Sequence, residues 1–326
     1  MKVLVTGATG FTGGHLARAL AVRGYDVRAL VRDDARAMDL ARAGVNLVTG
    51  DLTDSSSWAG ALDGVEVVYN IAALYRQAGL AESTYRRVNA VAVGDLVAAA
   101  AASGVRRVVH CSTVGVHGDI EHPPGDEDAP LRPGDVYQDT KVEGERLARA
   151  AAERTGIELT IARPSGIYGP GDRRLLKLFR GVARRRFIVL GHGRIFYHLT
   201  YIDDLVEGVR LCGEVTAAAG RTYILAGGEV STLNELVSLI AEEAGVGPPR
   251  VHLPVWPFWI AGAACEAVCR PLGIEPPLYR RRVDFFTKSR AFRIDRARRE
   301  LGFVPAVGLR DGVRRTLAWY KERGWL

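Results

Sequence analysis

The chain of 326 residues is long enough to bury a large core, and we expect a large α/β domain with a smaller companion rather than one large domain. Its hydrophobic share of 48% and charged share of 25% are typical of a folded globular protein and exclude a disordered chain. No apolar run of about 20 residues is long enough to cross a bilayer, and no leader precedes the first strand, so a cytoplasmic protein without an integral membrane segment is expected.

The net charge of +7 includes two basic runs, at 184–186 and 280–282, with no aromatic residues between the arginines. This pattern favours a solvated surface, with an anionic substrate or a membrane surface as alternatives, and it disfavours a nucleic acid partner. The four cysteines are too scattered for a disulfide framework. Cys265 and Cys269 have no second pair of ligands nearby, so we expect buried thiols and no metal site.

Residues 2–15 begin as an apolar β-favouring run, break into glycines and resume at helical spacing. Gly7, Gly10 and Gly13 lack side chains, so the turn is free to adopt a positive φ and a diphosphate is able to lie against backbone N–H groups at a helix N-terminus. The spacing is Gly-x-x-Gly-x-x-Gly, and its position after an N-terminal strand predicts a dinucleotide cradle. The alternative is a glycine turn without a ligand.

Strands and helices alternate through the first half of the chain. Strands are predicted at 25–31, 46–49, 65–70, 108–112 and 159–163, and helices at 35–43, 55–62, 83–103 and 138–154. A loop rich in proline and acids is expected at 117–135. This alternation predicts a doubly wound (Rossmann) parallel sheet of the α/β class.

After Pro164 the regular alternation ends. A basic helix is predicted at 173–186, an apolar helix within 254–272 and a final amphipathic helix at 309–323. Thr232 and Glu235 form a capping box for a helix that ends at Ala244. We therefore expect a dinucleotide-binding domain at 1–165, to which segments near 195–225 return, and a smaller, mixed, mainly substrate-binding domain at 166–326.

Tyr137 and Lys141 lie four residues apart where a loop passes into a helix, so their side chains share a face. A tyrosine pKa near 10 must fall by about 3 units, or about 4 kcal/mol, for proton transfer at neutral pH. One ammonium about 4 Å away supplies roughly that much at an effective dielectric constant near 20. The alternative is a chance pair on an exposed helix face.

The strand at 108–112 ends in hydroxyl groups, Ser112 and then Thr113. Ligands of a doubly wound sheet lie beyond the carboxyl ends of its strands. Either hydroxyl is therefore placed to bond a substrate oxygen, although a hydroxyl that merely terminates the strand is an equally simple interpretation.

The cradle, the strand-end hydroxyls and Tyr-x-x-x-Lys, in this order, resemble the extended short-chain dehydrogenase/reductase family, which includes sugar epimerases, dehydratases, dihydroflavonol reductases and 3β-hydroxysteroid dehydrogenases. The resemblance extends over nearly the whole chain. It includes Gly50-Asp51-Leu52, Arg163-Pro164, the run at 168–172, Tyr201-Ile202-Asp203-Asp204 and the run at 300–305.

The resemblance implies hydride exchange between a carbinol carbon and nicotinamide, with Tyr137 as the acid/base, Lys141 as its pKa partner and ribose ligand, and Thr113 as the second hydroxyl. Alignment of Val116-His117-Gly118 with the family's Val-Tyr-Gly favours Thr113 over Ser112. The implied cofactor ligands are Gly7, Gly10, Phe11, Thr12, Gly13, Arg32, Asp51, Leu52, Ala72, Ala73, Lys141 and Pro164.

Three departures from family patterns narrow the function. Val114 and Gly115 replace the Asp-Glu or Ser-Glu pair that follows the threonine in the family's dehydratases and decarboxylases, which disfavours dehydration. Arg32, after Val31, resembles the arginine that meets the 2′-phosphate in NADP-using members, so NADP is favoured, although Asp33 and Asp34 keep NAD open.

The third departure is Tyr197, which stands where nucleotide-sugar enzymes carry an arginine for the substrate diphosphate. Residues 280–282 or Arg293 are the candidate substitutes. The apolar helix within 254–272 is open to three interpretations: core packing or a dimer seam, a lid over an apolar substrate, or a membrane-surface contact.

The sequence therefore predicts an NAD(P)-dependent oxidoreductase acting on a small molecule. The first choice is a nucleotide-sugar epimerase or 4-ketoreductase, and the second is a dehydrogenase or reductase of an apolar, steroid-like or flavonoid-like alcohol. A regulator that senses NADP without turnover is the third, disfavoured by Tyr137 and Lys141. The resemblance also implies a homodimer through the helices at 83–103 and 138–154.

Overall fold

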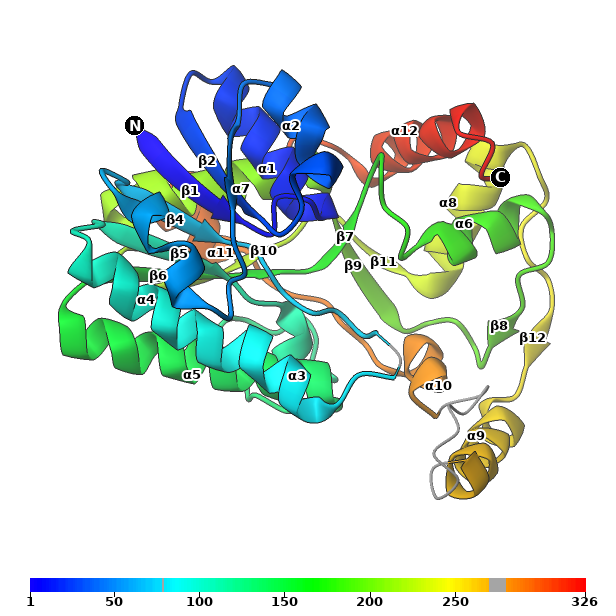
Figure 1. Ribbon diagram of the computed structural model, residues 1–326. Helices are drawn as coiled ribbons and strands as arrows, with labels where there is room; N and C mark the ends of the chain where they lie inside the picture. The colour runs from blue at the N-terminus through cyan, green and yellow to red at the C-terminus, as the bar shows by residue number, and fades with distance from the viewer. Residues whose placement is uncertain (78, 270–279) are drawn as a thin grey trace.

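The computed structural model describes residues 1–77, 79–269 and 280–326, and side chains other than those of residues 280–282. Its main sheet has seven parallel strands in the order β10-β6-β5-β4-β1-β2-β3 (Figure 1). Their bounds are β1 Lys2–Thr6, β2 Asp26–Val31, β3 Asn46–Thr49, β4 Val67–Asn70, β5 Arg107–Cys111, β6 Glu158–Pro164 and β10 Thr222–Leu225. This order confirms the predicted doubly wound sheet. Strands β2 and β3 are added on one side of β1 and the later strands on the other, so the strand order reverses between β1 and β4.

Helices cover both faces of the main sheet (Figure 1). One face carries α1 (Phe11–Val22), α2 (Met38–Arg42), α7 (Ile202–Glu214) and α11 (Asp295–Leu301); the other carries α3 (Glu82–Arg86), α4 (Ala92–Ala102) and α5 (Val136–Thr155). Each layer has a fully buried apolar core, with Leu16 and Leu205 in one and Leu96 and Ala148 in the other. The β-branched strands and small helix residues explain why these layers pack closely.

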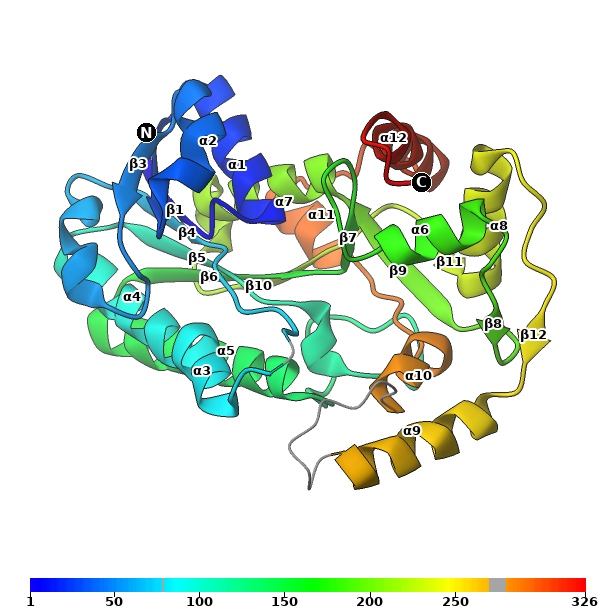
Figure 2. The same ribbon diagram turned by 45° about the vertical axis from the view of Figure 1, so that its right-hand side comes forward.

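A smaller group of elements, mostly C-terminal, lies beside the carboxyl edge of the main sheet (Figure 2). Its three-stranded sheet, β11-β9-β7, is mixed, because β7 runs parallel and β11 antiparallel to β9; β8 and β12 form a parallel pair. The bounds are β7 Gly166–Tyr168, α6 Leu176–Ala183, β8 Val189–Leu190, β9 Phe196–Tyr201, β11 Val230–Thr232, α8 Leu233–Ala244, β12 His252–Leu253, α9 Val255–Cys269, α10 Arg280–Thr287 and α12 Leu309–Glu322. The capping box of Thr232 and Glu235 is formed as predicted.

Four predicted helices differ from the structure. In place of the helix at 35–43, a 3₁₀ turn, Asp34–Ala37, precedes the short helix α2. Residues 55–62 form two 3₁₀ turns, Ser55–Ser57 and Ala59–Leu62, because serines and glycine support an α-helix poorly. The helix at 83–103 is interrupted by a π-type turn, Arg87–Val91. The basic helix is shorter than 173–186, because the carboxylate of Asp172 accepts the N–H groups of Arg174 and Leu175 and holds that segment in a turn.

Helix α9 projects from the rest of the molecule (Figure 2). Trp256 is 66% exposed and Trp259 49%, so the core-packing interpretation of this helix is wrong; residues 270–272 of the predicted apolar segment lie outside the described residues. Cys265 and Cys269 are partly exposed, whereas Cys111 and Cys212 are buried as expected. No helix among the described residues is both long and apolar enough to span a membrane.

Candidate active site

A cavity of about 1100 Å³ opens at the carboxyl ends of β1 and β4, where the strand order reverses, and extends to the smaller group of elements. Apart from the buried Lys141, every residue predicted to bind the cofactor lines it: Gly7, Gly10, Phe11, Thr12, Gly13, Arg32, Asp51, Leu52, Ala72, Ala73 and Pro164. Thr113 and Tyr137 line it as well. Residues separated by more than 150 positions are thus brought to one cavity, as the parallel sheet requires.

The glycine turn between β1 and α1 has the geometry of a dinucleotide cradle. Gly7 has φ +67°, and a Cβ there would lie 2.7 Å from the backbone of Ala72. A Cβ on Gly13 would lie 2.3 Å from the carbonyl oxygen of Gly7. Gly10 begins α1 without a side-chain cap from the described residues, and the residues that carry the first N–H groups of the helix line the cavity. These residues fit the diphosphate of NAD(P).

At the adenosine end, Arg32 and Asp51 line the same wall of the cavity. Hydrogen bonds from the backbone N–H and hydroxyl of Thr53 hold the pKa of Asp51 below its usual range, and the charge of Arg32 acts in the same direction. Asp33 and Asp34 point to other partners: Asp33 accepts the N–H of Ala35, and Asp34 accepts the hydroxyl of Thr49. Neither acid is among the residues that line the cavity.

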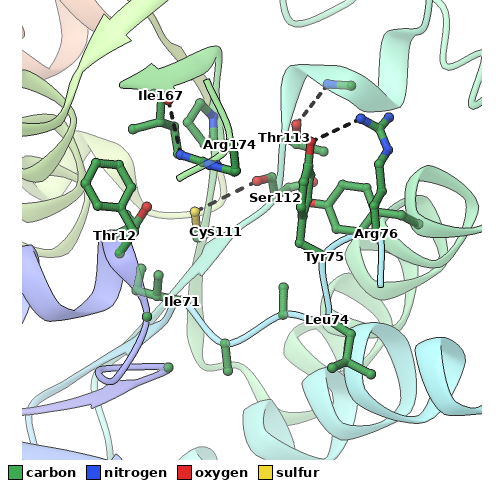
Figure 3. A pocket seen from close by; sticks show the side chains of 18 of the residues that line it. Thr12, Ile71, Leu74, Tyr75, Arg76, Cys111, Ser112, Thr113, Ile167 and Arg174 are labelled. Atoms are coloured by element: carbon green, nitrogen blue, oxygen red, sulfur yellow. Dashed lines mark hydrogen bonds between the residues drawn. The ribbon is translucent and has the colours of Figure 1, made fainter. Parts of the chain in front are cut away.

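The hydroxyl of Thr113 lies just beyond the carboxyl end of β5. Its Oγ1 accepts the N–H of Gly115 at 3.0 Å and so begins the short 3₁₀ turn Val114–His117 (Figure 3). Because this bond uses a lone pair, the hydroxyl hydrogen of Thr113 is left to donate to a ligand oxygen. Ser112, by contrast, is 3% exposed.

Helix α5 presents Tyr137 and Lys141 one turn apart. Asp135 begins this helix, because its Oδ1 accepts the N–H of Gln138 at 3.0 Å. The Nζ of Lys141 lies under the end of β5, 2.7 Å from the carbonyl oxygen of Cys111 and 3.2 Å from Nε2 of His110. Burial lowers the pKa of Lys141 to about 8.

The expected fall in the tyrosine pKa is not seen in this structure. Burial raises the pKa of Tyr137, and the cations that pull it downward are Arg76 and Arg174, not Lys141. The reason is geometric, since the ammonium of Lys141 is bonded beneath the strand end. The sequence analysis did not identify either arginine as a site residue. Each lies only a few residues after a stretch that it did identify: Arg76 follows Ala72 and Ala73, and Arg174 follows the run at 168–172.

Arg76 and Arg174 enter the cavity on opposite sides of Thr113 (Figure 3). Arg76 donates to Asp135 from Nε and Nη2, at 2.9 and 2.6 Å, and its guanidinium carbon lies 5.8 Å from the centre of the Tyr137 ring. Arg174 donates to the carboxylate of Asp172 and to the carbonyl oxygen of Ile167. Asp135 therefore both caps the helix that carries Tyr137 and fixes a cation beside it.

Aromatic side chains line the cavity beyond Tyr137. Tyr75 packs edge-to-face on Tyr137, with ring centres 5.0 Å apart. Tyr197, at the position where an arginine is expected in nucleotide-sugar enzymes, packs on Phe285 at 4.9 Å. These rings give this end apolar surface, which lies beside the charged side chains of Asp284 and Lys288.

The arginine near Tyr197 is Arg290, which no motif pointed to. The backbone of Arg290 forms an isolated parallel β-bridge with Tyr197, and Arg290 lines the cavity. Its buried Nε has no hydrogen-bond partner among the described residues. Of the substitutes proposed from sequence, Arg293 is exposed and pairs with Asp295, so it is not part of the cavity wall, and the side chains of 280–282 lie outside the described residues.

Comparison with known proteins agrees with this geometry. The model of the NAD dependent epimerase/dehydratase family matches residues 3–226. The chain is 32% identical over 334 residues to the 2-alkyl-3-oxoalkanoate reductase of Stenotrophomonas maltophilia (strain K279a), covering 98% of this chain and 99% of that protein. It is 31% identical over 346 residues to sterol demethylase protein B of Methylococcus capsulatus (strain ATCC 33009 / NCIMB 11132 / Bath), covering all of both chains.

Among solved structures, that of gox2253 superposes with a TM-score of 0.84 at 30% identity, and that of the Bacillus cereus UDP-glucuronic acid 4-epimerase in complex with NAD with 0.80 at 22% identity; each covers 99% of both chains. The second likeness concerns the fold. The chain therefore belongs to the NAD-dependent epimerase/dehydratase family, and it is an NAD(P)-dependent oxidoreductase of the extended short-chain dehydrogenase/reductase type.

Proposed function

We propose that this enzyme is an NADP-dependent dehydrogenase/reductase that interconverts a 3-hydroxy and a 3-oxo group on a large apolar substrate bearing a carboxylate. The observation that carries the proposal is the far end of the cavity, where Tyr197 and Phe285 form an apolar wall beside the unpartnered Nε of Arg290. This is the second of the two enzymatic functions expected from sequence. The aromatic ring of Tyr197 at the diphosphate position disfavours the nucleotide-sugar function.

In this proposal Tyr137 is the acid/base and Thr113 the second donor to the reacting oxygen. When bound, the nicotinamide cofactor supplies the hydride for reduction and accepts it for oxidation. During reduction, Tyr137 gives its phenolic proton to the ketone oxygen while the hydroxyl of Thr113 donates a second hydrogen bond to that oxygen. The guanidinium groups of Arg76 and Arg174 stabilise the phenolate of Tyr137, because both lower its pKa.

Two of the relatives named above support the substrate class. One is named for the reduction of a 2-alkyl-3-oxoalkanoate, a 3-oxo acid with two alkyl chains, and the other for sterol demethylation. Both compounds are more apolar than a sugar nucleotide. The carboxylate of an oxoalkanoate has the charge and the planar geometry that a guanidinium binds.

NADP is proposed over NAD because Arg32 lines the adenosine end of the cavity while Asp33 and Asp34 are bonded elsewhere. A guanidinium there matches a 2′-phosphate.

The test is to supply the purified protein with NADP⁺ and a 2-alkyl-3-hydroxyalkanoic acid, and separately with UDP-glucose and catalytic NAD⁺. We expect reduced nicotinamide to accumulate with the hydroxy acid and no epimerised sugar to form. Epimerisation of the sugar nucleotide without net reduction of cofactor would overturn the proposal. Tight NADPH binding with no turnover of hydroxy acids or 3β-hydroxysteroids would favour the regulator instead.

A further inference from the structure

A second arginine lines the adenosine end of the cavity. Arg87 begins the π-type turn Arg87–Val91, which continues α3, and both Thr84 and Val88 line the cavity beside it. Thr84 lies three residues before Arg87 and four before Val88, a spacing that places side chains on one face of a helix. This face of the helical segment therefore forms part of the cavity wall, and Arg87 is its charged member.

Arg32 and Asp51 leave the main sheet side by side at the same end. Strand β2 ends at Val31, whose carbonyl oxygen accepts the N–H of Gly50 at 2.8 Å, so the residues that follow β2 and β3 are neighbours. The positive charges of Arg32 and Arg87 both reach the carboxylate of Asp51 and lower its pKa. One guanidinium from the sheet and one from the helical layer are thus brought to the same carboxylate.

The guanidinium groups of Arg32 and Arg87 are not paired with other side chains. Both arginines are exposed, and neither side chain has a hydrogen bond or an ion pair with any residue that the structure describes. Asp51 forms no ion pair with them, and its Oδ1 instead accepts the N–H and the hydroxyl of Thr53. Two cations and one anion leave an excess of positive charge at this end of the cavity.

Arg86 shows how a neighbouring arginine behaves at the surface. It donates from Nε and Nη2 to the carboxylate of Glu143, at 2.9 and 2.6 Å, and it does not line the cavity. Arg87, the next residue, has no such partner and lines the cavity. Anionic groups, and phosphates in particular, are the ligands that a free guanidinium binds best.

We propose that Arg87 is a specificity-determining residue for the cofactor: with Arg32 it brackets the 2′-phosphate of NADP, so that two guanidinium groups bind this anion. The inference rests on the NADP part of the proposed function and adds a second residue to it. A phosphate monoester carries a charge of about −1.5 to −2 at neutral pH, so one guanidinium neutralises only part of it. NAD has a neutral hydroxyl at the same carbon, and Arg87 therefore favours NADP alone.

The test compares Arg87→Met with the matched control Arg86→Met. Methionine keeps an unbranched apolar stem and favours a helix, so the change removes the guanidinium and little else. The Kd values of NADPH and NADH are measured by fluorescence titration of the purified proteins, without substrate. We expect the Kd of NADPH to rise about five- to tenfold in Arg87→Met and that of NADH to change by less than about twofold. Both values should change by less than about twofold in Arg86→Met.

A second pair of ligands isolates the adenosine end. Adenosine 2′,5′-bisphosphate and adenosine 5′-monophosphate differ only in the 2′-phosphate, and neither carries nicotinamide. In competition with NADPH, Arg87→Met should weaken the bisphosphate about five- to tenfold and the monophosphate by less than about twofold. Equal losses for the two ligands would show that Arg87 contacts the adenosine itself, and they would overturn the proposal.

Unchanged NADPH affinity in Arg87→Met, or equal losses of NADPH and NADH, would also overturn it. If the wild type prefers NADPH and Arg87→Met keeps that preference, the role of Arg87 is rejected and the assignment of NADP stands. If the wild type binds NADH as tightly as NADPH, the NADP part of the proposed function is rejected together with the inference. The titrations need no turnover, so an error in the substrate class leaves the role of Arg87 intact.

Discussion

The two ends of the cavity are built in different ways. The cofactor end is made of backbone and short strand-end turns, with Gly7, Gly13 and Ala72 in mutual contact near the strand reversal. The substrate end is made of side chains from four separate segments, represented by Tyr75, Arg174, Tyr197 and Arg290. Local motifs are therefore enough to identify what the first end binds, whereas the second is assembled only when the chain folds.

Tyr137, the proposed proton donor, lies where the two ends meet, and replacing it should have the largest effect. We expect Tyr137→Phe to lower kcat by about 10³-fold, within the range that general acid–base catalysis supplies, because phenylalanine has no phenolic proton to give to the ketone oxygen. The measurement is kcat with the hydroxy acid and NADP⁺.

The affinity of Tyr137→Phe for NADPH serves as its control and should stay within a factor of about three, because the phenol is not part of the glycine cradle. A kcat within tenfold of the wild type would reject the acid/base role of Tyr137. Tyr137 would then be a residue that only lines the cavity where its two ends meet.

The substrate end alone should respond to Arg290→Leu. Loss of a charge-assisted hydrogen bond costs about 1.5–3 kcal/mol, so kcat/KM for a carboxylate substrate should fall about 10- to 100-fold. The methyl ester of the same substrate should lose less than threefold, as should the acid with the control Arg293→Leu, which changes an exposed arginine paired with Asp295. Equal losses for acid and ester would show that Arg290 supports the fold and does not bind the anion.

The cofactor end alone should respond to Arg32→Ala. We expect the Kd for NADPH to rise about tenfold and the Kd for NADH to change less than twofold, because only the first carries a 2′-phosphate. Arg36→Ala is the matched control, since Arg36 is exposed, pairs with Asp33 and does not line the cavity. Cofactor titration by fluorescence measures both Kd values. If Arg32→Ala weakens the binding of NADPH and of NADH by the same factor, Arg32 maintains the shape of the turn and does not bind the 2′-phosphate.

The contrast between the two ends also explains how far the sequence could be interpreted. The doubly wound sheet was predictable because apolar strands and amphipathic helices alternate with clear turn residues. The interruption of the helix at 83–103 was not, because it depends on Asn89, whose amide bonds Leu74 and Thr140 across a gap of up to 51 residues. A tertiary contact decided the local conformation there, not an intrinsic helix preference.

The candidate site divides in the same way. Thr113, Tyr137 and the glycines were identifiable because each belongs to a short motif whose spacing reflects one turn or one helical repeat. Arg290 has no such motif, since its place beside Tyr197 arises from a strand-like contact between segments 93 residues apart. The buried contacts among Thr6, Asn70 and His110 were also missed, because a threonine, an asparagine and a histidine in three strands become neighbours only through the register of the sheet.

The smallest effect is expected from a change that destabilises the substrate half without touching the cavity. Thr232→Ala removes the cap of α8, where the hydroxyl accepts the N–H of Glu235 at 3.2 Å, and should cost about 1 kcal/mol of unfolding free energy. Ser238→Ala, at an exposed position of the same helix, is the control and should leave the free energy of unfolding within about 0.5 kcal/mol. Denaturant unfolding measures both.

If the halves unfold together, Thr232→Ala lowers the single midpoint while the Kd for NADPH stays unchanged. A weaker NADPH affinity in this variant would show instead that the cofactor end depends on the order of the substrate half, and the two ends would no longer be separable.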